Sequence, residues 1–378
     1  MNLALVLNHR CNLRCRYCYT GRKFDRAMPL DVAYRAVEFG LDQSRTGHLT
    51  LSFFGGEPLM EIEAMEAIVP YAEKRAQERS ATLIFSISTN GTLLDKRRLT
   101  LLRDHKFHIQ VSIDGVPAAQ NLARPFADGR PSHAEVFANL QRLVSEDLLE
   151  QVVAIIDPAT VPWLCESYQQ LAAAGAREIH FSPNYLGDWT DEACARFESA
   201  LRDMGEAYLD GYRQGQSLRL DPLYGKIVSH LIRGTSRPRR CGFGADEMAV
   251  APSGRIYPCD RMVREDDNPA MQLGDLENGL DRARCQKIQA SRRQVDPECA
   301  ACDLRPRCVQ WCGCAQWETT RTLGRVSPIF CWFERSFIAE ADRIAGILFA
   351  ERNPAFLREC YALEPCVPRT LHTGQESP

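Results

Sequence analysis

The chain has 378 residues, of which 45% are hydrophobic and 25% are charged, a composition typical of a globular protein with about two domains. Its 46 basic and 49 acidic side chains leave a formal charge of −3, which excludes a global positive field that would recruit nucleic acid or an anionic membrane. The sequence has no uninterrupted apolar stretch of about 18 residues, so it predicts no membrane span.

Short apolar or β-branched runs alternate with longer helical patterns from Met1 to about Thr190. This alternation is typical of βα units around a parallel sheet, and it predicts an α/β fold with an open or partial (β/α)6 barrel. Asp95 and Ser132 are predicted helix N-caps, and Gly175 is predicted to end the last of these helices. The expected strands are 3–7, 49–54, 83–89, 108–113, 152–156 and 178–182, and the expected helices are 30–43, 62–79, 95–104, 134–150 and 161–174.

Three cysteines follow the first predicted strand in the run Cys11-x3-Cys15-x2-Cys18. Three thiolates on one short loop can hold three corners of a cubane cluster and leave the fourth iron for a ligand that is not protein. A zinc site would need four ligands, usually in two Cys-x2-Cys pairs. A disulfide framework would need an oxidising compartment, but the apolar start of the chain is too short for a signal peptide. Sixteen cysteines therefore indicate metal-bound thiols in a reducing cytoplasm.

This run resembles the cluster motif of the radical S-adenosylmethionine (SAM) enzymes. The resemblance implies that the open iron chelates the amino and carboxylate groups of SAM. It also implies that Tyr17, which precedes Cys18, lies against the adenine. SAM would then be cleaved to methionine and a 5′-deoxyadenosyl radical.

Two glycines and a carboxylate follow the second predicted strand, as Gly55, Gly56 and Glu57. Barrel sheets place their chemistry at the carboxyl ends of the strands. The glycines would allow a close approach of the backbone to a ligand, and the carboxylate could accept hydrogen bonds from an ammonium group. The run resembles the SAM-binding GGE segment of the same family.

Short polar side chains follow the next two strands, as Ser88 and Asn90 and then Ser112 and Asp114. They either begin turns or contact the ribose and carboxylate of a nucleotide-like cofactor, and the family resemblance implies the second role. Arg124 lies in the loop after the fourth strand. It either forms a surface salt bridge or pairs with the SAM carboxylate.

Beyond about Leu220 the alternation stops and cysteines concentrate. Two stacked zinc sites are one interpretation of their spacing. The spacing resembles the SPASM extension of peptide-modifying radical SAM enzymes, which carries two auxiliary [4Fe–4S] clusters. The pattern is Cys241-x12-Gly254-x4-Cys259, then Cys299-x2-Cys302-x5-Cys308-x3-Cys312, and finally Cys331.

The resemblance also implies which cysteines share a cluster. Three alternatives stay open for the fourth ligand of the first auxiliary cluster. The position is an open iron without a protein ligand, or it is filled by a residue other than cysteine, or it is filled by Cys314. Asp260 stands where an aspartate acts as a base in sulfatase-maturating enzymes; the alternative is a contact to backbone amides. Cys165, Cys194 and Cys285 lie in helical patterns and are expected to be small buried side chains. The first auxiliary cluster would be held by Cys241, Cys259 and Cys312, and the second by Cys299, Cys302, Cys308 and Cys331.

These features together predict a radical SAM barrel over residues 1–220, a SPASM domain over 221–335, a packing helix within 336–368 and a flexible tail over 369–378. The expected enzyme crosslinks a ribosomally made precursor peptide or protein through a carbon–carbon or thioether bond. It would use SAM, three [4Fe–4S] clusters and an electron donor of the flavodoxin or ferredoxin type. The alternatives are formylglycine formation in a sulfatase and, in another class, a cluster carrier without catalysis.

Overall fold

The structure is a computed structural model, and it describes residues 1–231 and 241–361. Within these residues eleven strands form one sheet in the order β11-β10-β9-β8-β1-β2-β3-β4-β5-β6-β7. The strands are β1 (Asn2–Val6), β2 (His48–Phe54), β3 (Thr82–Thr89), β4 (His108–Ser112), β5 (Leu149–Ile156), β6 (Glu178–Pro183), β7 (Arg219–Asp221), β8 (Glu247–Val250), β9 (Arg255–Tyr257), β10 (Gly274–Asp275) and β11 (Gly279–Leu280).

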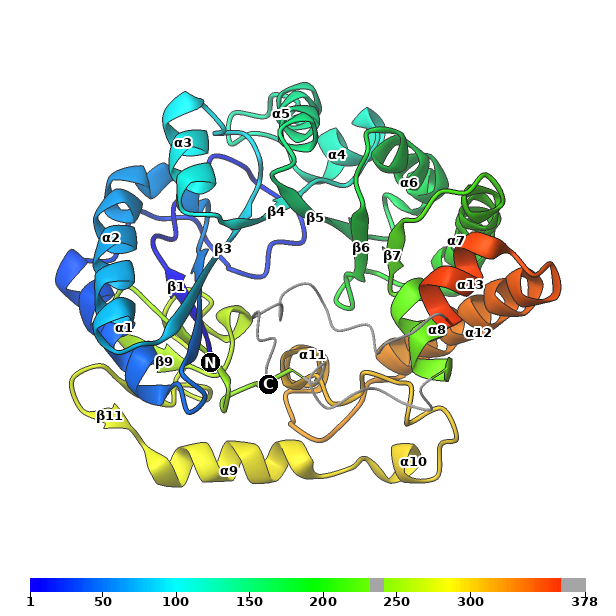
Figure 1. Ribbon diagram of the computed structural model, residues 1–378. Helices are drawn as coiled ribbons and strands as arrows, with labels where there is room; N and C mark the ends of the chain where they lie inside the picture. The colour runs from blue at the N-terminus through cyan, green and yellow to red at the C-terminus, as the bar shows by residue number, and fades with distance from the viewer. Residues whose placement is uncertain (232–240, 362–378) are drawn as a thin grey trace, which may run out of the picture.

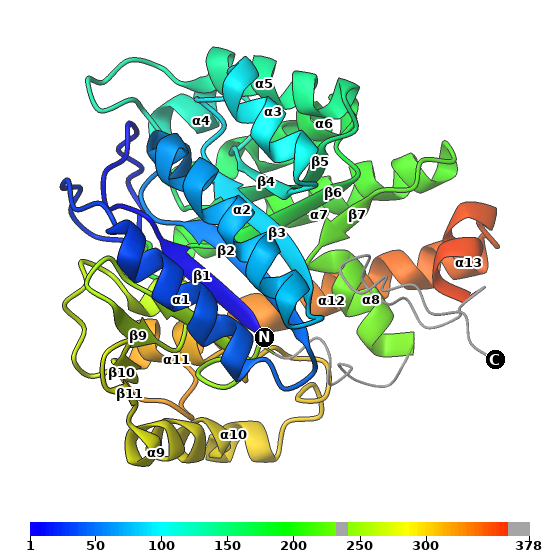
Figure 2. The same cartoon turned by 60° about the vertical axis from the view of Figure 1, so that its left-hand side comes forward.

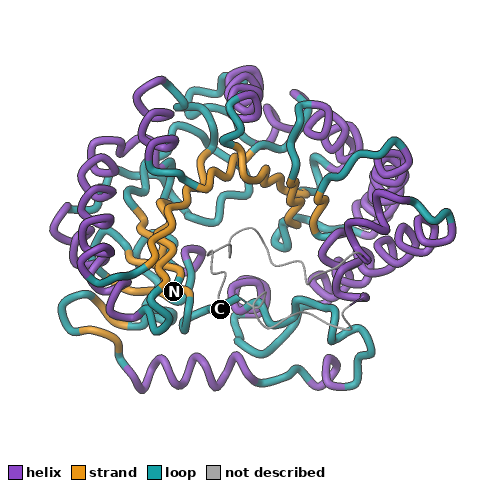
Figure 3. Tube along the Cα trace, viewed as in Figure 1, coloured by secondary structure: helices purple, strands orange, loops and turns teal. Residues whose placement is uncertain are grey.

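Strands β1 to β7 are parallel neighbours in chain order, and they curve into an open arc (Figure 1; Figure 3). The helices between them lie on the outside of the arc, as expected when each strand and the next are joined by a helical crossover. The partial barrel predicted from the sequence is confirmed. The helices are α1 (Leu30–Gln43), α2 (Ile62–Glu78), α3 (Lys96–Asp104), α4 (Pro117–Ala123), α5 (His133–Ser145), α6 (Leu164–Ala173), α7 (Asp191–Arg213) and α8 (Leu223–Leu231).

The two faces of the arc differ in polarity. On β2 and β3 the apolar residues Phe53 and Ile87 are almost fully buried, because alternate side chains of a strand point toward the outer helices. The intervening serines are only half-buried, and Ser52 and Ser86 pair across the two strands with 2.6 Å between their hydroxyl oxygens. The inner face of the barrel therefore carries serine hydroxyl groups on β2 and β3.

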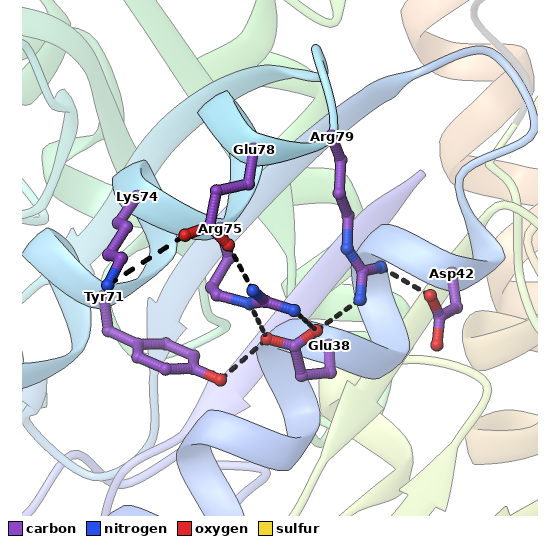
Figure 4. A network of polar contacts seen from close by, with 7 residues as sticks. All are labelled: Glu38, Asp42, Tyr71, Lys74, Arg75, Glu78 and Arg79. Atoms are coloured by element: carbon purple, nitrogen blue, oxygen red, sulfur yellow. Dashed lines mark hydrogen bonds and ion pairs between the residues drawn. The ribbon is translucent and has the colours of Figure 1, made fainter.

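An ion-pair network joins α1 and α2 on the outer surface, away from the inner face (Figure 4). Glu38 accepts hydrogen bonds from the Tyr71 hydroxyl at 2.7 Å and from Nε of Arg75 at 2.6 Å, and it also pairs with Arg79. The guanidinium of Arg75 contributes most to holding the pKa of Glu38 below its ordinary value. The network fixes the packing of two crossover helices.

The C-terminal part continues the same sheet. Strand β8 pairs with the free edge of β1 and runs parallel to it, and β9 to β11 follow as antiparallel strands. Helix α12 packs on α7 and α8, with Phe197 and Phe333 in contact at a ring distance of 4.9 Å. Seen from the side, α9 and α11 lie below β1 (Figure 2). These helices are α9 (Arg282–Arg293), α10 (Pro297–Ala300), α11 (Gly313–Thr320), α12 (Pro328–Ala350) and α13 (Pro354–Tyr361).

Several predicted boundaries are wrong. The helix expected over 134–150 ends at Ser145, because Asp147 takes a left-handed conformation (φ 54°) and β5 begins at Leu149. The helix expected over 161–174 starts with a short 3-10 turn that contains Pro162. The sequence also missed β7, whose three residues are too few to show a pattern.

The predicted caps had mixed outcomes. Asp95 caps α3 by accepting a hydrogen bond from the Arg98 amide at 2.9 Å, and Gly175 follows α6 with φ of 91°. Both predictions are confirmed. Ser132 occupies the N-cap position of α5, but its hydroxyl makes no capping bond, because it donates to the carbonyl of Arg124 at 2.6 Å. The proposed domain limits stay a prediction, and residues 369–378 lie outside the described part.

No helix in the described ranges is long and apolar enough to cross a bilayer.

Candidate functional site

The loop with the first three cysteines is anchored against the end of β2. The Gly56 amide donates to the carbonyl of Asn8 at 2.8 Å, and the Glu57 amide donates to that of Arg10 at 3.0 Å. A Cβ atom at Gly55 would lie 2.4 Å from the Asn8 oxygen, and one at Gly56 would lie 2.1 Å from the Arg10 oxygen. Such contacts are impossible for a larger residue. The two glycines therefore allow the end of β2 to approach the backbone that leads into the cysteine loop.

Two thiols of this loop, those of Cys11 and Cys18, have different polar environments. Cys11 Sγ accepts from the Leu13 amide at 3.4 Å, and Lys23 Nζ lies 3.0 Å from Cys18 Sγ. Burial alone raises the pKa of Cys18, but Lys23 and hydrogen bonds from Thr20 outweigh it and lower that pKa below its ordinary value. The Cys18 thiol is therefore prepared to ligate as a thiolate.

Glu57 holds the ends of β2 and β3 together. Its carboxylate accepts from the Leu59 amide at 3.0 Å, the Thr89 hydroxyl at 2.7 Å and the Asn90 amide at 2.7 Å, and the residue is 1% exposed. Burial raises its pKa to about 7. The structure thus gives this carboxylate three protein donors, and its contact with a cofactor ammonium stays a prediction.

Asn90 links the end of β3 to the cysteine loop. Its amide nitrogen Nδ2 donates to Asn12 Oδ1 at 2.8 Å and lies 3.7 Å from Cys11 Sγ. Its Oδ1 accepts from the Thr92 hydroxyl at 2.6 Å. Asn90 therefore orients the loop around Cys11.

Asp114, Arg124 and Tyr17 form one buried cluster. Asp114 Oδ1 lies 3.1 Å from Arg124 Nε and accepts from the Ile155 amide at 2.9 Å, and the Tyr17 hydroxyl donates to Oδ2. The guanidinium of Arg124 lies 5.2 Å from the centre of the Tyr17 ring. Arg124 is thus neither a surface residue nor unpaired, because Asp114 holds its charge. Ser112, half-buried on the inner face like Ser88, precedes this cluster.

The last predicted cysteine group converges on one pocket. Arg335 is at its rim, with Nε 3.4 Å from Cys331 Sγ and Nη2 3.9 Å from Cys302 Sγ. Beneath it Glu334 pairs with Lys226 at 2.6 Å, and both side chains are only 4% exposed. Positive charge beside the sulfurs favours their thiolate form. The four cysteines that line this pocket are Cys299, Cys302, Cys308 and Cys331.

A second group forms where β9 and the start of α11 meet. Cys312 Sγ lies 3.2 Å from Cys314 Sγ, and Cys259 is hydrogen-bonded to Cys314. Cys241 Sγ lies 3.8 Å from the carboxylate of Glu247. The structure therefore brings together the three cysteines expected here and Cys314, which was one of the candidates for the fourth ligand.

Asp260 joins this group to the first cysteine loop. Its Oδ2 accepts from the hydroxyl of Tyr19 at 3.1 Å, and its Oδ1 lies 3.1 Å from Cys259 Sγ. Arg261 stacks over the Tyr19 ring at 4.4 Å. The carboxylates of Glu247 and Asp260 and the Cys259 thiol all lie within 4.8 Å of one another. The structure thus gives Asp260 a tyrosine and a cysteine as its partners.

Backbone amides point at the sulfurs in all three groups. The thiols of Cys11, Cys18, Cys241 and Cys308 each accept from the amide two residues further along the chain. Amide-to-sulfur bonds of this kind support and tune iron–sulfur ligation, and every cysteine in the described residues is a free thiol. The residues therefore fit [4Fe–4S] clusters.

Sequence reasoning missed four residues of these sites, three of which contact a residue that is distant in the chain. Tyr19 reaches Asp260, Glu247 reaches Cys241 and Cys259, and Arg335 reaches Cys302. Lys23 is the exception, since it lies five residues after Cys18 and a local positive charge was visible in the sequence.

Several known proteins are similar to this chain in sequence. An uncharacterized protein from Methanocaldococcus jannaschii is 27% identical over 48% of this chain, a match that covers 61% of that protein. The PqqA peptide cyclase of Gluconobacter oxydans is 26% identical, with 87% of this chain and 90% of that protein covered. The cysteine-type anaerobic sulfatase-maturating enzyme of Clostridium novyi is 22% identical, with 92% and 96% covered.

Two solved structures show the same fold. One is the native anSMEcpe with bound AdoMet and the Cp18Cys peptide, with a TM-score of 0.76, 19% identity, and coverage of 93% of this chain and 100% of that one. The other is Streptococcus suis SuiB bound to precursor peptide SuiA, with a TM-score of 0.60, 14% identity, and coverage of 86% and 75%. Residues 5–157, which run from the end of β1 through β5 and include the first cysteine loop, match the model of the Radical SAM superfamily, so the chain contains a radical SAM domain.

Proposed function

We propose that this protein is a radical SAM maturase that oxidatively crosslinks a ribosomally made peptide or protein in a reducing cytoplasm. The observation that carries the proposal is the convergence of cysteines distant in sequence into two sites beside the barrel, in addition to the first loop. The relatives named as a peptide cyclase and a sulfatase maturase, and the neighbours solved with peptides, support a peptide or protein substrate.

Three [4Fe–4S] clusters complete the proposal. Cys11, Cys15 and Cys18 would hold the SAM-binding cluster, and the two convergent groups would hold the auxiliary ones. The chemistry supplied by the first cluster and SAM is reductive cleavage to methionine and a 5′-deoxyadenosyl radical, which abstracts hydrogen from substrate. A flavodoxin- or ferredoxin-type protein would deliver the electron.

The residues around the first loop position this chemistry. Gly56 holds the loop against β2, Asn90 holds it from β3, and Lys23 places a positive charge beside Cys18. The half-buried serines of the inner face, Ser88 and Ser112, offer hydroxyl groups to a nucleotide in the barrel. These contacts bind and orient, which is the part of such reactions that belongs to the protein.

Asp260 is the proposed base. Its carboxylate lies between the Tyr19 hydroxyl and the Cys259 thiol, so it stands between the first loop and the nearer auxiliary site. After hydrogen abstraction, the proton lost from the substrate radical would pass to this carboxylate and the electron to an auxiliary cluster, while Tyr19 keeps the carboxylate oriented. General bases of this kind contribute about 10²–10⁴-fold to a rate.

The test is an anaerobic reaction of the reconstituted protein with SAM, dithionite and a candidate peptide. A short precursor peptide encoded beside this protein is the first candidate, and a sulfatase-derived peptide with serine or cysteine at the reactive position is the second. We expect 5′-deoxyadenosine and a product that has lost two hydrogens per new bond. A formylglycine product would establish the sulfatase alternative, and the absence of 5′-deoxyadenosine would contradict catalysis altogether.

Two variants test the assigned residues. Cys15→Ala should abolish 5′-deoxyadenosine release, whereas Cys194→Ala, a cysteine on α7 outside the three groups, should leave it unchanged. Asp260→Asn should retain SAM cleavage while product formation falls about 10²-fold or more. Equal losses of both products in Asp260→Asn would show that this carboxylate is structural.

A further inference from the structure

Cys314 lies outside the spacing pattern that identifies the cluster ligands, yet it is built into the first auxiliary site. It is 9% exposed, and its Sγ lies 3.2 Å from that of Cys312. It also shares a hydrogen bond with Cys259. Two of the three expected ligands are thus its direct neighbours.

The start of α11 explains why both Cys312 and Cys314 face this site. Cys312 is the N-cap residue of the helix, and Gly313 is its first residue. A Cβ atom at Gly313 would lie 2.8 Å from the ring of Phe243, which is completely buried. Because glycine allows this approach, the helix start packs against the loop that carries Cys241. The amide of Ala315 then donates to Cys312 Sγ.

Other candidates for the fourth ligand are weaker. The segment 232–240, which precedes Cys241, contains no cysteine. The carboxylate of Asp260 is engaged by Tyr19. Glu247 lies 3.8 Å from Cys241 Sγ, but iron–sulfur clusters are held chiefly by cysteine thiolates.

We propose that Cys314 is the fourth protein ligand of the first auxiliary cluster. The four thiols of Cys241, Cys259, Cys312 and Cys314 then saturate its irons, so this cluster has no open position for a substrate thiolate. Its role is confined to electron transfer and to tying α11 to the barrel sheet through β8 and β9. The inference rests on the proposed function, because it assumes that the site holds a cluster.

The experiment uses the full chain with Cys11, Cys15 and Cys18 replaced by alanine, so that only the auxiliary clusters remain. In this background Cys314→Ala is compared with Cys285→Ala, a cysteine on α9 that contacts a backbone carbonyl instead. We expect Cys314→Ala to lose one iron per chain and to show the electron paramagnetic resonance signal of a three-iron cluster after oxidation. Cys314→Ser should retain the iron with an altered spectrum, and Cys285→Ala should match the background.

A second measurement requires no change at position 314. Cyanide is added to the background protein with Cys314 intact, and its reduced clusters are monitored by the same resonance method. A saturated cluster should leave the spectrum unchanged. A cyanide-shifted spectrum, together with full iron content in Cys314→Ala, would overturn the inference in favour of an open iron. Iron loss in Glu247→Gln but not in Cys314→Ala would overturn it in favour of a carboxylate ligand.

The measurements distinguish a failure of the proposed auxiliary clusters from a failure of the Cys314 assignment. If the background protein binds no iron and sulfide at all, the proposed auxiliary clusters are wrong. If it binds both clusters and Cys314→Ala leaves them intact, the function stands and only the assignment of Cys314 is wrong.

Discussion

The glycine at position 56 offers the sharpest test of how the first cysteine loop is held. Gly56→Ala would place a Cβ atom 2.1 Å from the Arg10 carbonyl oxygen and 2.8 Å from that of His9. Both are backbone atoms, so no side chain can rotate away. Either the end of β2 or the loop must move, and the loop leads to Cys11 one residue later.

The expected cost follows from the contacts that must change. Overpacking in a filled region costs about 1–3 kcal/mol. The displaced segments share the bond from the Glu57 amide to Arg10 at 3.0 Å, and losing one such bond costs about 1 kcal/mol. We therefore expect a destabilisation of about 2–4 kcal/mol. Because the displacement reaches Cys11, iron in the SAM-binding cluster should also fall.

Denaturant unfolding under anaerobic conditions measures the loss of stability. Iron analysis measures the loss of the SAM-binding cluster, in a protein whose auxiliary cysteine ligands are replaced by alanine. The matched control is Gly346→Ala on α12, where a new Cβ would meet no atom within 4 Å. That control should be more stable by about 0.5–1 kcal/mol, because alanine favours helix over glycine. Unchanged stability and full iron in Gly56→Ala would refute the anchoring role of this glycine.

Three further predictions concern buried or capping groups. Burial raises the pKa of Glu57 to about 7, so the folded state keeps a proton that the unfolded state loses above about pH 4.5. The free energy of unfolding should therefore fall by about 3 kcal/mol as the pH rises from about 4.5 to about 7. Glu57→Gln should flatten that slope in unfolding measured across pH, and an unchanged slope would contradict the assignment. Lys226→Met leaves Glu334 buried without its charged partner and should lower the free energy of unfolding by about 3–5 kcal/mol. The control is Lys74→Met, which removes an exposed ion pair 4.0 Å apart. It should change the free energy of unfolding by about 0.5 kcal/mol or less in the same assay. Asp95→Ala removes the cap of α3 and should cost about 1 kcal/mol; no loss on denaturant unfolding would mean that the cap is dispensable.

The inner face of the barrel illustrates what local pattern determines. Alternation along β3 places Ile87 against the helices and Ser88 inside, and a strand expresses this pattern wherever it pairs. The spacing of Cys11, Cys15 and Cys18 is equally local, because one short loop carries all three. For these reasons the barrel strands and the first cysteine loop could be predicted from the amino-acid sequence.

The partners of the charged groups were decided by tertiary structure. Glu57 is occupied by donors from the chain itself, and Arg124 is paired with Asp114. Nothing in the sequence near Arg124 indicates that pairing. It depends on the turn from β4 into α4, which brings Arg124 back to Asp114, and a buried charge takes whatever partner the fold brings to it.

The auxiliary sites show the same division. The resemblance of their spacing to the SPASM extension predicted seven cysteines as a set, but the meeting of Cys259 with Cys314 depends on how β9 and α11 are packed. Likewise, the pairing of β8 with β1 joins the cysteine-rich region to the barrel across more than half the chain. Local pattern determines the secondary structure and the metal-binding chemistry of this chain. Only long-range packing determines which cysteines share a site, because that choice depends on contacts between distant segments.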